Sequence, residues 1–292
     1  MKIALVAGEA YPDLLPSNGA LRDALAAAGA EVSVLLWNRD GEADFLDPDL
    51  CVLRQTWDYQ DDPGGFAAWA SRVEALGARL TPPAPLAIWN NDKRSLVAFG
   101  AEGIAIPATV ALTSPTDPAL ASLPTERIVV KPAFGGSGVG VHLSTRADLA
   151  GTLAEVRAEA PGRPLMAQEF LPEIAEGEWK MICIEGEVAL TIRAVPRGDT
   201  FRINSRFDPE ITVADPPPDA VRIAQRICAL LGRPLVARID GVMRGAGFIC
   251  TEVEVTDPDL FLDRDSRAAD LLAQAILRHA RGPASGQLHP LG

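Results

Sequence analysis

The sequence predicts an α/β protein, built from a first domain with a parallel sheet and two further subdomains of α+β structure. Three observations support this fold class. A strand–helix–strand pattern opens the chain over residues 2–36, strands and helices then alternate, and residues 179–195 and 238–254 each have the pattern of two strands joined by a glycine turn. The length of 292 residues and the hydrophobic content of 48% allow a sizeable core in two or three subdomains. We place the domains at residues 1–84, 85–165 and 166–281, followed by a mobile tail over residues 282–292.

The composition narrows the range of functions. The formal net charge is −12, from 39 acidic and 27 basic residues, which argues against a nucleic-acid partner and against binding to an anionic membrane. No apolar run reaches transmembrane length, and the first residues lack the cleavage pattern of a signal peptide. The four cysteines have no C-x-x-C spacing, which predicts reduced, buried thiols in a cytoplasmic protein. Only three histidines occur, so a histidine-rich metal site or a Ser/His/Asp triad is poorly supported.

The first elements are a strand over residues 2–8, a helix over about 17–28 and a strand over 31–36. Ser17 or Asn18 is expected to cap this helix, and Gly29 ends it. No G-x-G-x-x-G motif follows the first strand, so a nucleotide site there is unsupported. The unit is therefore expected to supply packing and substrate contacts.

A third buried strand over residues 50–53 leads into Arg54, Trp57 and Asp58. Ligands of open α/β sheets bind at the carboxyl ends of the strands. These three side chains could there recognise a carboxylate, a flat group and an amine respectively. The alternative interpretation is a helix cap beside a core tryptophan. A helix over 64–76 and a last short strand complete the first domain.

Two lysines in the middle of the chain lie at positions where they could bind an anion. Lys93 lies in the first turn of a short helix capped by Asn91 or Asp92, where the helix dipole disfavours a cation. After a strand near residues 104–106, a strand over 127–132 brings Lys131 to the start of a loop.

That loop, residues 135–140, contains four glycines, so consecutive backbone N–H groups can turn toward one centre, as in loops that cover polyphosphate. It lacks the Gly-Lys-Ser/Thr ending and the following helix of a Walker P-loop. A plain glycine-rich hairpin is the alternative, but a lysine directly before the loop can pair with the same phosphates. A helix capped by Thr145 is expected to follow and to run to about Ala160.

Two later segments expose polar groups. The strand over 164–169 stops pairing at Pro172, which leaves main-chain groups near Glu169 and Leu171 available to a ligand. The loop after the strand over 188–195 contains or adjoins four arginines together with Asn204: Arg193, Arg197, Arg202 and Arg206. A mobile basic loop fits capture of an anionic substrate or phosphate, and a solvated loop is the alternative. Helices over residues 219–231 and 265–278 are expected on either side of the last hairpin.

The hairpin over residues 238–254 is predicted to hold the chemistry. A three-residue loop, Gly245-Ala246-Gly247, would place Asp240 opposite Glu252 and Arg238 opposite Glu254. These four side chains would share one face, and Ile239, Thr251 and Val253 would face the core. Three carboxylates this close repel one another unless a cation joins them, and oxygen-only ligands favour Mg²⁺ held together with a phosphate. The alternative is an acidic solvent face.

The order of these motifs resembles the ATP-grasp superfamily of carboxylate–amine ligases over residues 85–280. The motifs are Lys93, Lys131 with its glycine loop, Gln168-Glu169-Phe170-Leu171, Arg238-Ile-Asp and Glu252-Val-Glu254. The segment from Glu169 to Lys180 most resembles glutathione synthetase and the RimK-type ligases. Residues 54–59, 89–93 and the Glu-Val-Glu ending are more similar to the group of the cycloserine-forming O-ureido-serine cyclo-ligase. Glu254 stands where glutathione synthetase has Asn, and Lys180 stands where it has Arg.

The resemblance implies an ATP-grasp fold and a role for each matching residue. Lys93, Lys131 and the loop residues Gly135, Gly136, Ser137 and Gly138 would contact ATP phosphates, Glu169 and Leu171 the adenine, and Glu178 the ribose. Asp240, Glu252 and Glu254 would carry two Mg²⁺ ions, and Arg238 would stabilise the tetrahedral intermediate. We expect the substrate to contact Arg54, Trp57, Asp58, Lys180, Arg193, Arg202 and Asn204.

The expected activity is therefore ATP-dependent activation of a small carboxylate as an acylphosphate, which an amine then attacks to form a C–N bond. The partners would be small-molecule carboxylate and amine substrates, with a homodimer as a possible assembly. Two alternatives remain open: a regulatory nucleotide-binding protein without turnover, and a kinase that stops at the acylphosphate.

Overall fold

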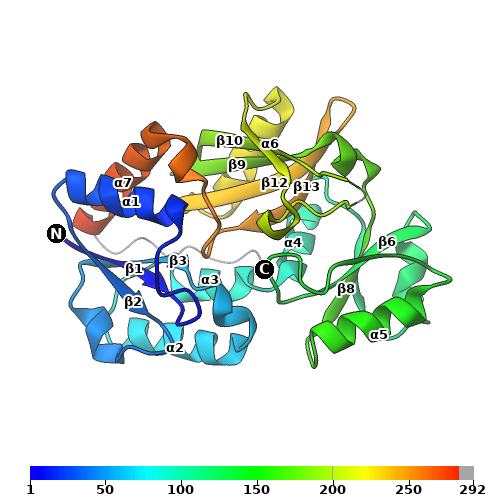
Figure 1. Ribbon diagram of the computed structural model, residues 1–292, viewed down its shortest axis with the longest axis horizontal. Helices are drawn as coiled ribbons and strands as arrows, with labels where there is room; N and C mark the ends of the chain where they lie inside the picture. The colour runs from blue at the N-terminus through cyan, green and yellow to red at the C-terminus, as the bar shows by residue number, and fades with distance from the viewer. Residues whose placement is uncertain (199, 283–292) are drawn as a thin grey trace.

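The computed structural model describes residues 1–198 and 200–282, and its strands form three sheets (Figure 1). The tail predicted over residues 282–292 falls outside the described residues except for Gly282. Within the described ranges, no helix combines the length and the apolar character needed to cross a membrane. The mixed α/β class predicted from the sequence is confirmed, with one parallel and two antiparallel sheets.

The first sheet is parallel, with the strand order β2-β1-β3-β4. Its strands are β1 (Lys2–Ala7), β2 (Glu31–Leu36), β3 (Leu50–Gln55) and β4 (Leu80–Thr81). Alternate residues of β1 enter two different cores: Ile3 and Leu5 pack with helix α1 (Pro16–Ala27), and Ala4 and Val6 pack with helix α2 (Pro63–Ala75). Helices therefore cover both faces, which explains why the central strands are continuous apolar runs.

Helix α1 begins one residue earlier than predicted, and neither Ser17 nor Asn18 caps it. Pro16 occupies the first turn, where its missing N–H costs nothing, and Leu15 is the N-cap residue without a side-chain hydrogen bond. Both polar side chains are used elsewhere. The Ser17 hydroxyl accepts a hydrogen bond from Leu262 N, and the Asn18 side chain bonds to Arg54.

The last helix of the chain, α7 (Ser266–Arg281), packs against α1 (Figure 1). Leu21 and Leu25 of α1 share a core with Leu272 and Ile276 of α7. The same core contains Ile182 and other residues of the large antiparallel sheet. The first and last segments of the sequence therefore belong to one hydrophobic cluster.

The second sheet is antiparallel, with the order β5-β8-β6-β7. Its elements are β5 (Thr109–Leu112), β6 (Arg127–Pro132), β7 (His142–Thr145), β8 (Leu165–Glu169) and the covering helix α5 (Leu149–Glu159). The strand predicted at residues 104–106 is absent, because the carbonyl of Ala105 bonds to Cys250 N and sheet pairing starts only after Pro107. Thr145 does not cap α5 but exchanges hydrogen bonds with Asp148, so the helix starts at Leu149.

Strand β8 pairs with β5 and β6, so the predicted boundary between residues 165 and 166 falls inside this sheet.

The third sheet is antiparallel, with the order β11-β10-β9-β12-β13. Its strands are β9 (Glu178–Ile184), β10 (Glu187–Val195), β11 (Glu210–Val213), β12 (Val236–Arg244) and β13 (Gly247–Glu254). Helices α3 (Ala84–Asn90), α4 (Leu96–Ala101) and α6 (Pro218–Leu230) share a core with β12 and β13. Asn90 ties α3 to the hairpin through Val253 O and Val255 N, which brings the following Lys93 beside β13.

Short 3-10 helices connect these elements. They are η1 (Glu42–Leu46), η2 (Trp57–Gln60), η3 (Lys93–Ser95), η4 (Pro118–Ser122), η5 (Pro172–Glu176), η6 (Ser205–Phe207) and η7 (Leu262–Arg264). Asp92 caps η3 by accepting from Arg94 N, as expected, but Trp89 and Asn90 end the preceding helix instead of starting one.

Candidate active site

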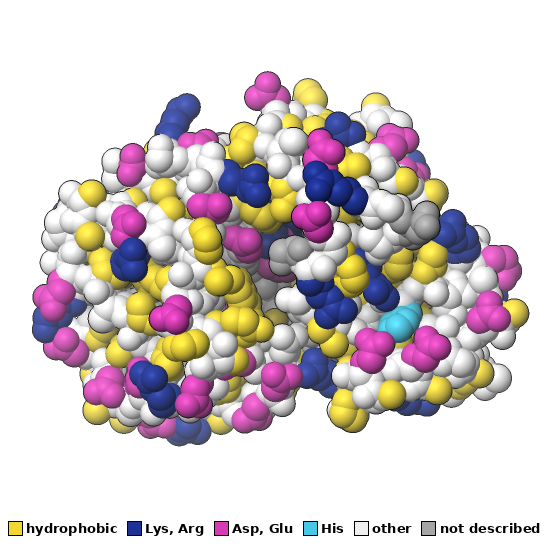
Figure 2. Space-filling model, in the orientation of Figure 1, with side chains coloured by type: hydrophobic (Ala, Val, Ile, Leu, Met, Phe, Trp, Pro, Cys, Tyr) yellow, Lys and Arg dark blue, Asp and Glu magenta, His cyan; other side chains and the backbone are white. Residues whose placement is uncertain are grey.

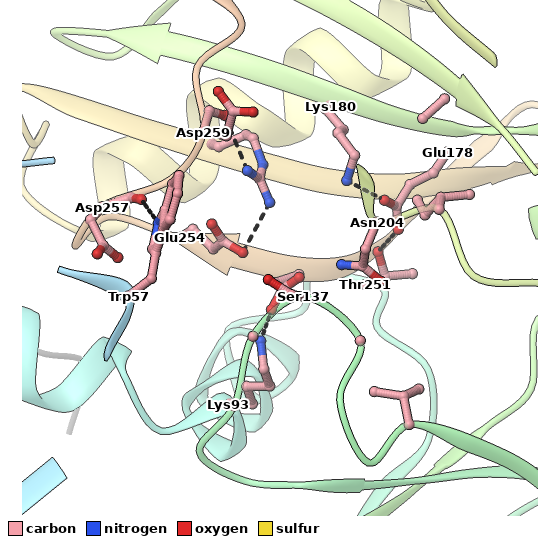
Figure 3. A pocket seen from close by; sticks show the side chains of 18 of the residues that line it. Trp57, Lys93, Ser137, Glu178, Lys180, Asn204, Thr251, Glu254, Asp257 and Asp259 are labelled. Atoms are coloured by element: carbon pink, nitrogen blue, oxygen red, sulfur yellow. Dashed lines mark hydrogen bonds and ion pairs between the residues drawn. The ribbon is translucent and has the colours of Figure 1, made fainter. Parts of the chain in front are cut away.

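A cavity of about 540 Å³ is lined by residues of the second and third sheets, and Figure 2 shows the molecule hollowed near the centre of this face. Helix α1, the 3-10 helix η2 after β3, the segment between β6 and β7 and the loop after β10 complete its walls. Most of the residues predicted for the site line it: Trp57, Lys93, Lys131, Gly135, Gly136, Ser137, Gly138, Glu178, Lys180, Arg202, Asn204, Arg238, Glu252 and Glu254. Figure 3 shows Glu178, Lys180, Thr251 and Asn204 grouped on one side, and Trp57, Glu254, Asp257 and Asp259 on the other. The cavity therefore has two ends of different character.

The hairpin β12–β13 pairs Arg238 with Glu254 and Asp240 with Glu252, as predicted. The predicted three-residue turn is wrong, because Arg244 pairs with Gly247 and only Gly245 and Ala246 form the turn. A β-bulge at Thr251 then shifts the register by one residue and restores the expected pairing. Thr251 consequently leaves the core face predicted for it and lines the cavity, where its hydroxyl donates to Glu178 Oε1 at 2.8 Å.

A buried ion network forms part of the cavity wall, and Asp240 lies at its centre. Lys180 Nζ donates to Glu178 Oε2 at 2.6 Å and to Asp240 Oδ2 at 2.7 Å. Arg238 Nε donates to Asp240 Oδ1 at 2.8 Å, and Arg238 Nη2 pairs with Glu254 Oε1 at 2.9 Å. Burial opposes the charge of Lys180, but Asp240 and Glu178 raise its pKa above the ordinary value. Glu178 at one end and Glu254 at the other are thus joined through Asp240.

Asp240, Glu252 and Glu254 form the candidate metal centre. Each offers a carboxylate oxygen, and these oxygens lie within 4.8 Å of one another. Glu252 and Glu254 line the cavity, whereas Asp240 is 1% exposed and lies behind Lys180 and Arg238. Asp240 Oδ1 accepts from one donor in the described part of the chain, which leaves it a lone pair for a cation. An oxygen-only donor set of this spacing fits Mg²⁺.

The two glutamates of the candidate metal centre differ in charge state. Burial opposes ionisation of Glu252, but Lys93 and Lys131 hold the pKa of its carboxyl well below the usual range, and Lys93 also forms an ion pair with it. Burial raises the pKa of Glu254 to about 7 against the opposing charge of Arg238. Glu252 is therefore ionised at neutral pH without any added cation, and Glu254 is the carboxylate that a bound cation would ionise.

The glycine loop, residues 134–141 between β6 and β7, presents backbone donors to the cavity. Ser137 and Gly138 both have positive φ angles, 53° and 71°, and form the centre of a tight turn in which Val139 N donates to Gly136 O at 3.2 Å. The N–H groups of Gly135, Ser137 and Gly138 have no hydrogen-bond partner among the described residues. Lys131 precedes the loop, and burial lowers the pKa of its ammonium to about 8. The loop offers what a phosphate requires: free N–H groups beside a lysine.

Contacts from other segments hold this loop, and two of them involve residues that the sequence did not identify. Gly136 N donates to Gln60 Oε1 at 2.6 Å, and Gly140 N donates to Glu159 Oε2 at 2.9 Å. On the other side, a Cβ on Gly138 would lie 2.6 Å from Asn204 Oδ1, so only glycine permits the loop after β10 to approach this closely. That loop also donates from Arg202 Nε to Val141 O at 2.9 Å.

Several predicted residues lie away from the cavity wall. Arg54 is fully buried and donates to Asn18 Oδ1 and to the carbonyl of Pro258, so the predicted direct contact with a substrate carboxylate is corrected. Asp58 accepts from Trp37 Nε1 and Asn38 Nδ2, so it stabilises the first domain instead of binding an amine. Arg193 donates to the carbonyl of Glu176 and stacks over Trp179. In each case, the side chain forms hydrogen bonds with residues that are distant in the sequence.

Glu169 and Leu171 also do not line the cavity. The Glu169 carboxylate accepts from Ala108 N and pairs with Arg244, and the Leu171 side chain packs against Val242 and Ile249. Leu171 N has no partner in the ranges that the structure describes. Their assignment to adenine stays a prediction that depends on the main chain.

The far end of the cavity is formed by the segment after β13, which the prediction did not include. Asp257 and Asp259 line it, and burial raises the pKa of the Asp257 carboxyl to about 6. Trp57 Nε1 donates to Asp257 O at 2.9 Å, and Thr56 Oγ1 donates to Asp257 Oδ2 at 2.7 Å. Both aspartates follow Glu254 within five residues, so the acidic run itself was the available sequence signal.

Comparison with family models gives two matches along the chain. Residues 3–81 match the N-terminal domain of D-cycloserine synthetase DcsG, and residues 106–261 match the prokaryotic glutathione synthetase ATP-grasp domain. Glutathione synthetase from Agrobacterium fabrum is 31% identical over 140 residues, which cover 45% of this chain and 41% of that protein. The chain therefore spans less than half the length of this relative.

Two similarities extend over almost the whole chain. The cycloserine biosynthesis protein DcsG from Streptomyces lavendulae is 27% identical over 284 residues, covering 88% of this chain and 91% of that protein. The crystal structure of D-cycloserine synthetase DcsG superposes with a TM-score of 0.82 at 24% identity, covering 96% of this chain and all of that one. The D-alanine–D-alanine ligase from Bacillus anthracis superposes with a TM-score of 0.71 at 18% identity, covering 96% of this chain and 99% of that one.

Proposed function

We propose a catalytic function on the premise that the chain belongs to the family of the prokaryotic glutathione synthetase ATP-grasp domain, whose model matches more than half of it. The protein is an ATP- and Mg²⁺-dependent ligase. It transfers the γ-phosphoryl group of ATP to a small carboxylate and then joins the resulting acylphosphate to an amine, with release of ADP and phosphate. The substrates proposed are an amino acid or a small peptide.

The nucleotide is assigned to the end of the cavity bordered by the glycine loop. The free N–H groups of Gly135, Ser137 and Gly138 face a site that also contains Lys131 and Lys93. Charge-assisted hydrogen bonds of this kind hold phosphates in place, and no nucleophilic side chain is required for phosphoryl transfer. Glu178, 7% exposed and held by Lys180 and Thr251, is assigned to the ribose hydroxyls.

Asp240, Glu252 and Glu254 are assigned as ligands of two Mg²⁺ ions. When bound, such ions neutralise the charge of the transferring phosphoryl group. The charge balance around the hairpin supports two ions. There, the four cations Lys93, Lys131, Lys180 and Arg238 are matched by four carboxylates: Glu178, Asp240, Glu252 and Glu254. An ionised triphosphate brings about four negative charges, so two divalent cations return the site to neutrality.

The carboxylate and amine substrates are assigned to the end near Trp57, Asp257 and Asp259. In the first step, a carboxylate oxygen of the substrate attacks the γ-phosphorus and ADP leaves. In the second step, the amine nitrogen attacks the carbonyl carbon, gives up a proton and expels phosphate. Arg238 lines the cavity beside Glu254 and is placed to stabilise the negative charge of the tetrahedral intermediate.

One observation carries this proposal: a single cavity contains both the free backbone donors of the glycine loop and the acidic hairpin. A phosphate site and a metal site that share one cavity are what phosphoryl transfer needs. Either site alone would also suit a protein that binds nucleotide without turnover.

The test is ADP release from the wild-type protein with ATP and Mg²⁺, across a panel of amino acids and small peptides, with products identified by mass. ADP release with a condensed product supports the ligase. A phosphorylated acid that persists in the presence of amines would indicate a kinase, and ATP binding without ADP release would indicate a regulatory protein.

The variant Glu252→Gln keeps the shape of the side chain but removes one ligand charge. We expect it to fold normally and to lose ADP formation by more than about 100-fold. Glu187→Gln, on the exposed start of β10, is the matched control and should retain full activity. Full turnover by Glu252→Gln would remove the hairpin from the mechanism.

A further inference from the structure

A residue of the first domain, Gln60, contacts the glycine loop and has no role in the proposed function described above. Gln60 ends the 3-10 helix η2, which follows the central strand β3 of the first sheet. Its side-chain oxygen accepts the Gly136 N–H at 2.6 Å. Beside it, Arg163 Nη2 bonds to Asp61 Oδ1 at 2.8 Å, and Arg163 Nη1 donates to the carbonyl of Phe134. The start of the glycine loop is thus tied to the first domain at two neighbouring points.

These ties determine which N–H groups of the loop remain available. Gly136 donates to Gln60, Val139 donates to the carbonyl of Gly136, and Gly140 donates to Glu159. The donors without a partner within residues 1–198 and 200–282 include those of Gly135, Ser137 and Gly138, which flank the Gly136 anchor. A loop with this many glycines loses much conformational entropy when it is ordered. An anchor in the middle of the loop restricts it before a phosphate binds, so the loop loses less conformational entropy on binding.

We propose that Gln60 is a positioning residue for the nucleotide: it holds the Gly136 N–H so that the flanking N–H groups stay directed at the phosphates. This inference rests on the proposed function, because it takes the loop to be the phosphate site. Gln60 remains bonded to Gly136 when nucleotide is bound. Since Trp57 and Tyr59 of the same 3-10 helix line the cavity near the substrate end, the first domain thereby contributes to both ends of the site.

The test uses Gln60→Met, which keeps the side-chain length and removes the acceptor. Calorimetry is performed with the full chain, Mg²⁺ and the non-hydrolysable analogue AMP-PNP, and separately with AMP, which has no β- or γ-phosphate. Loss of one hydrogen bond should raise the AMP-PNP dissociation constant by about threefold to tenfold. The AMP constant should change by less than about twofold, because AMP does not reach the anchored donors. A general structural defect would weaken both.

Asp61→Asn is the matched control across the same contact. Asp61 is exposed, with 76% of its side-chain surface accessible, so its ion pair with Arg163 should contribute little. We expect its AMP-PNP affinity to stay within about twofold of wild type. Unchanged AMP-PNP binding by Gln60→Met would overturn the proposal. Tighter binding would also overturn it, because Gln60 would then be a competitor that phosphate displaces.

Hydrogen exchange of the Gly136 amide gives a second measurement that does not depend on the variant folding. In the nucleotide-free wild type, this amide should exchange at least about tenfold more slowly than those of Ser137 and Gly138. Equal exchange of the three amides would refute the anchor. If wild type binds no AMP-PNP, the proposed function fails, while the exchange result still decides whether Gln60 holds the loop.

Discussion

The hairpin β12–β13 and the glycine loop border the same cavity, but they hold their functional groups in different ways. The hairpin presents side chains whose positions follow from strand register, and buried ion pairs fix them to one another. The glycine loop presents backbone N–H groups, and distant residues hold the loop: Gln60 and Glu159 each accept from one of its N–H groups, and Asn204 lies close to Gly138. The charges proposed to bind metal are thus built into a sheet, whereas the donors proposed to bind phosphate depend on contacts between separate parts of the fold.

This difference predicts that the hairpin network contributes to folding as well as to chemistry. Lys180→Met removes the cation between Glu178 and Asp240 and leaves two buried carboxylates with fewer partners. Because Asp240 keeps Arg238 and Glu178 keeps Thr251, we expect a loss of about 3 kcal/mol in the free energy of unfolding. The melting temperature should fall by roughly 5–10 °C, as measured by circular dichroism.

Two variants sharpen that result. Lys180→Arg can form both ion pairs and should recover most of the stability. Arg278→Met breaks an ion pair on the surface, between side chains that are 55% and 48% exposed, and should cost less than about 1 kcal/mol. If Lys180→Met were no worse than Arg278→Met, the buried network would not distinguish the hairpin from the surface.

The glycine loop should show the opposite behaviour, a large effect on binding and a small one on stability. Lys131→Ala removes a cation that burial already disfavours, so the fold should tolerate it. The nucleotide loses a charge-assisted hydrogen bond worth roughly 1.5–3 kcal/mol, which corresponds to about 10- to 150-fold in the dissociation constant of AMP-PNP. Calorimetry measures the loss, and an unchanged affinity would return the loop to an ordinary glycine-rich hairpin.

The charge state of Lys131 adds a smaller effect that depends on pH. Burial lowers the pKa of this ammonium to about 8, so it is cationic below that pH and becomes neutral above it. Affinity for AMP-PNP should therefore fall as the pH rises, by about tenfold from about pH 7 to about pH 9. Lys131→Arg, which stays protonated over this range, should bind with little dependence on pH. The same decline in both proteins would assign the titration to another group.

The sequence predicted the hairpin better than the loop for a physical reason. Strand periodicity and a glycine turn are local signals, so the pairing of Asp240 with Glu252 could be derived from spacing alone. The bulge at Thr251 has no such signal, and it compensated for the wrong turn length. The strands of the first sheet were likewise predicted from their periodicity. The helix starts at Pro16 and Leu149 were not predicted, because the side chains expected to cap these helices form hydrogen bonds with other residues.

The residues that were misassigned share a different cause. Arg54 and Asp58 occur at the carboxyl end of a parallel strand, where the general rule for α/β sheets predicts ligand contacts. Their partners, Pro258 in one case and Trp37 with Asn38 in the other, come from segments that only the folded chain brings near. Gln60, three residues beyond Trp57, was overlooked because nothing local marks a glutamine that bonds to a loop 76 residues away.

The packing of α1 against α7 determines when the first domain can be completed during synthesis. Leu21 and Leu25 are synthesised before the two other domains, but Leu272 and Ile276, which cover them, are synthesised after those domains. The first 84 residues therefore keep an apolar helix face open until residues 266–281 have been synthesised. An exchange of the first domain between related proteins would therefore have to include residues 266–281 together with residues 1–84, although the two segments are far apart in the gene.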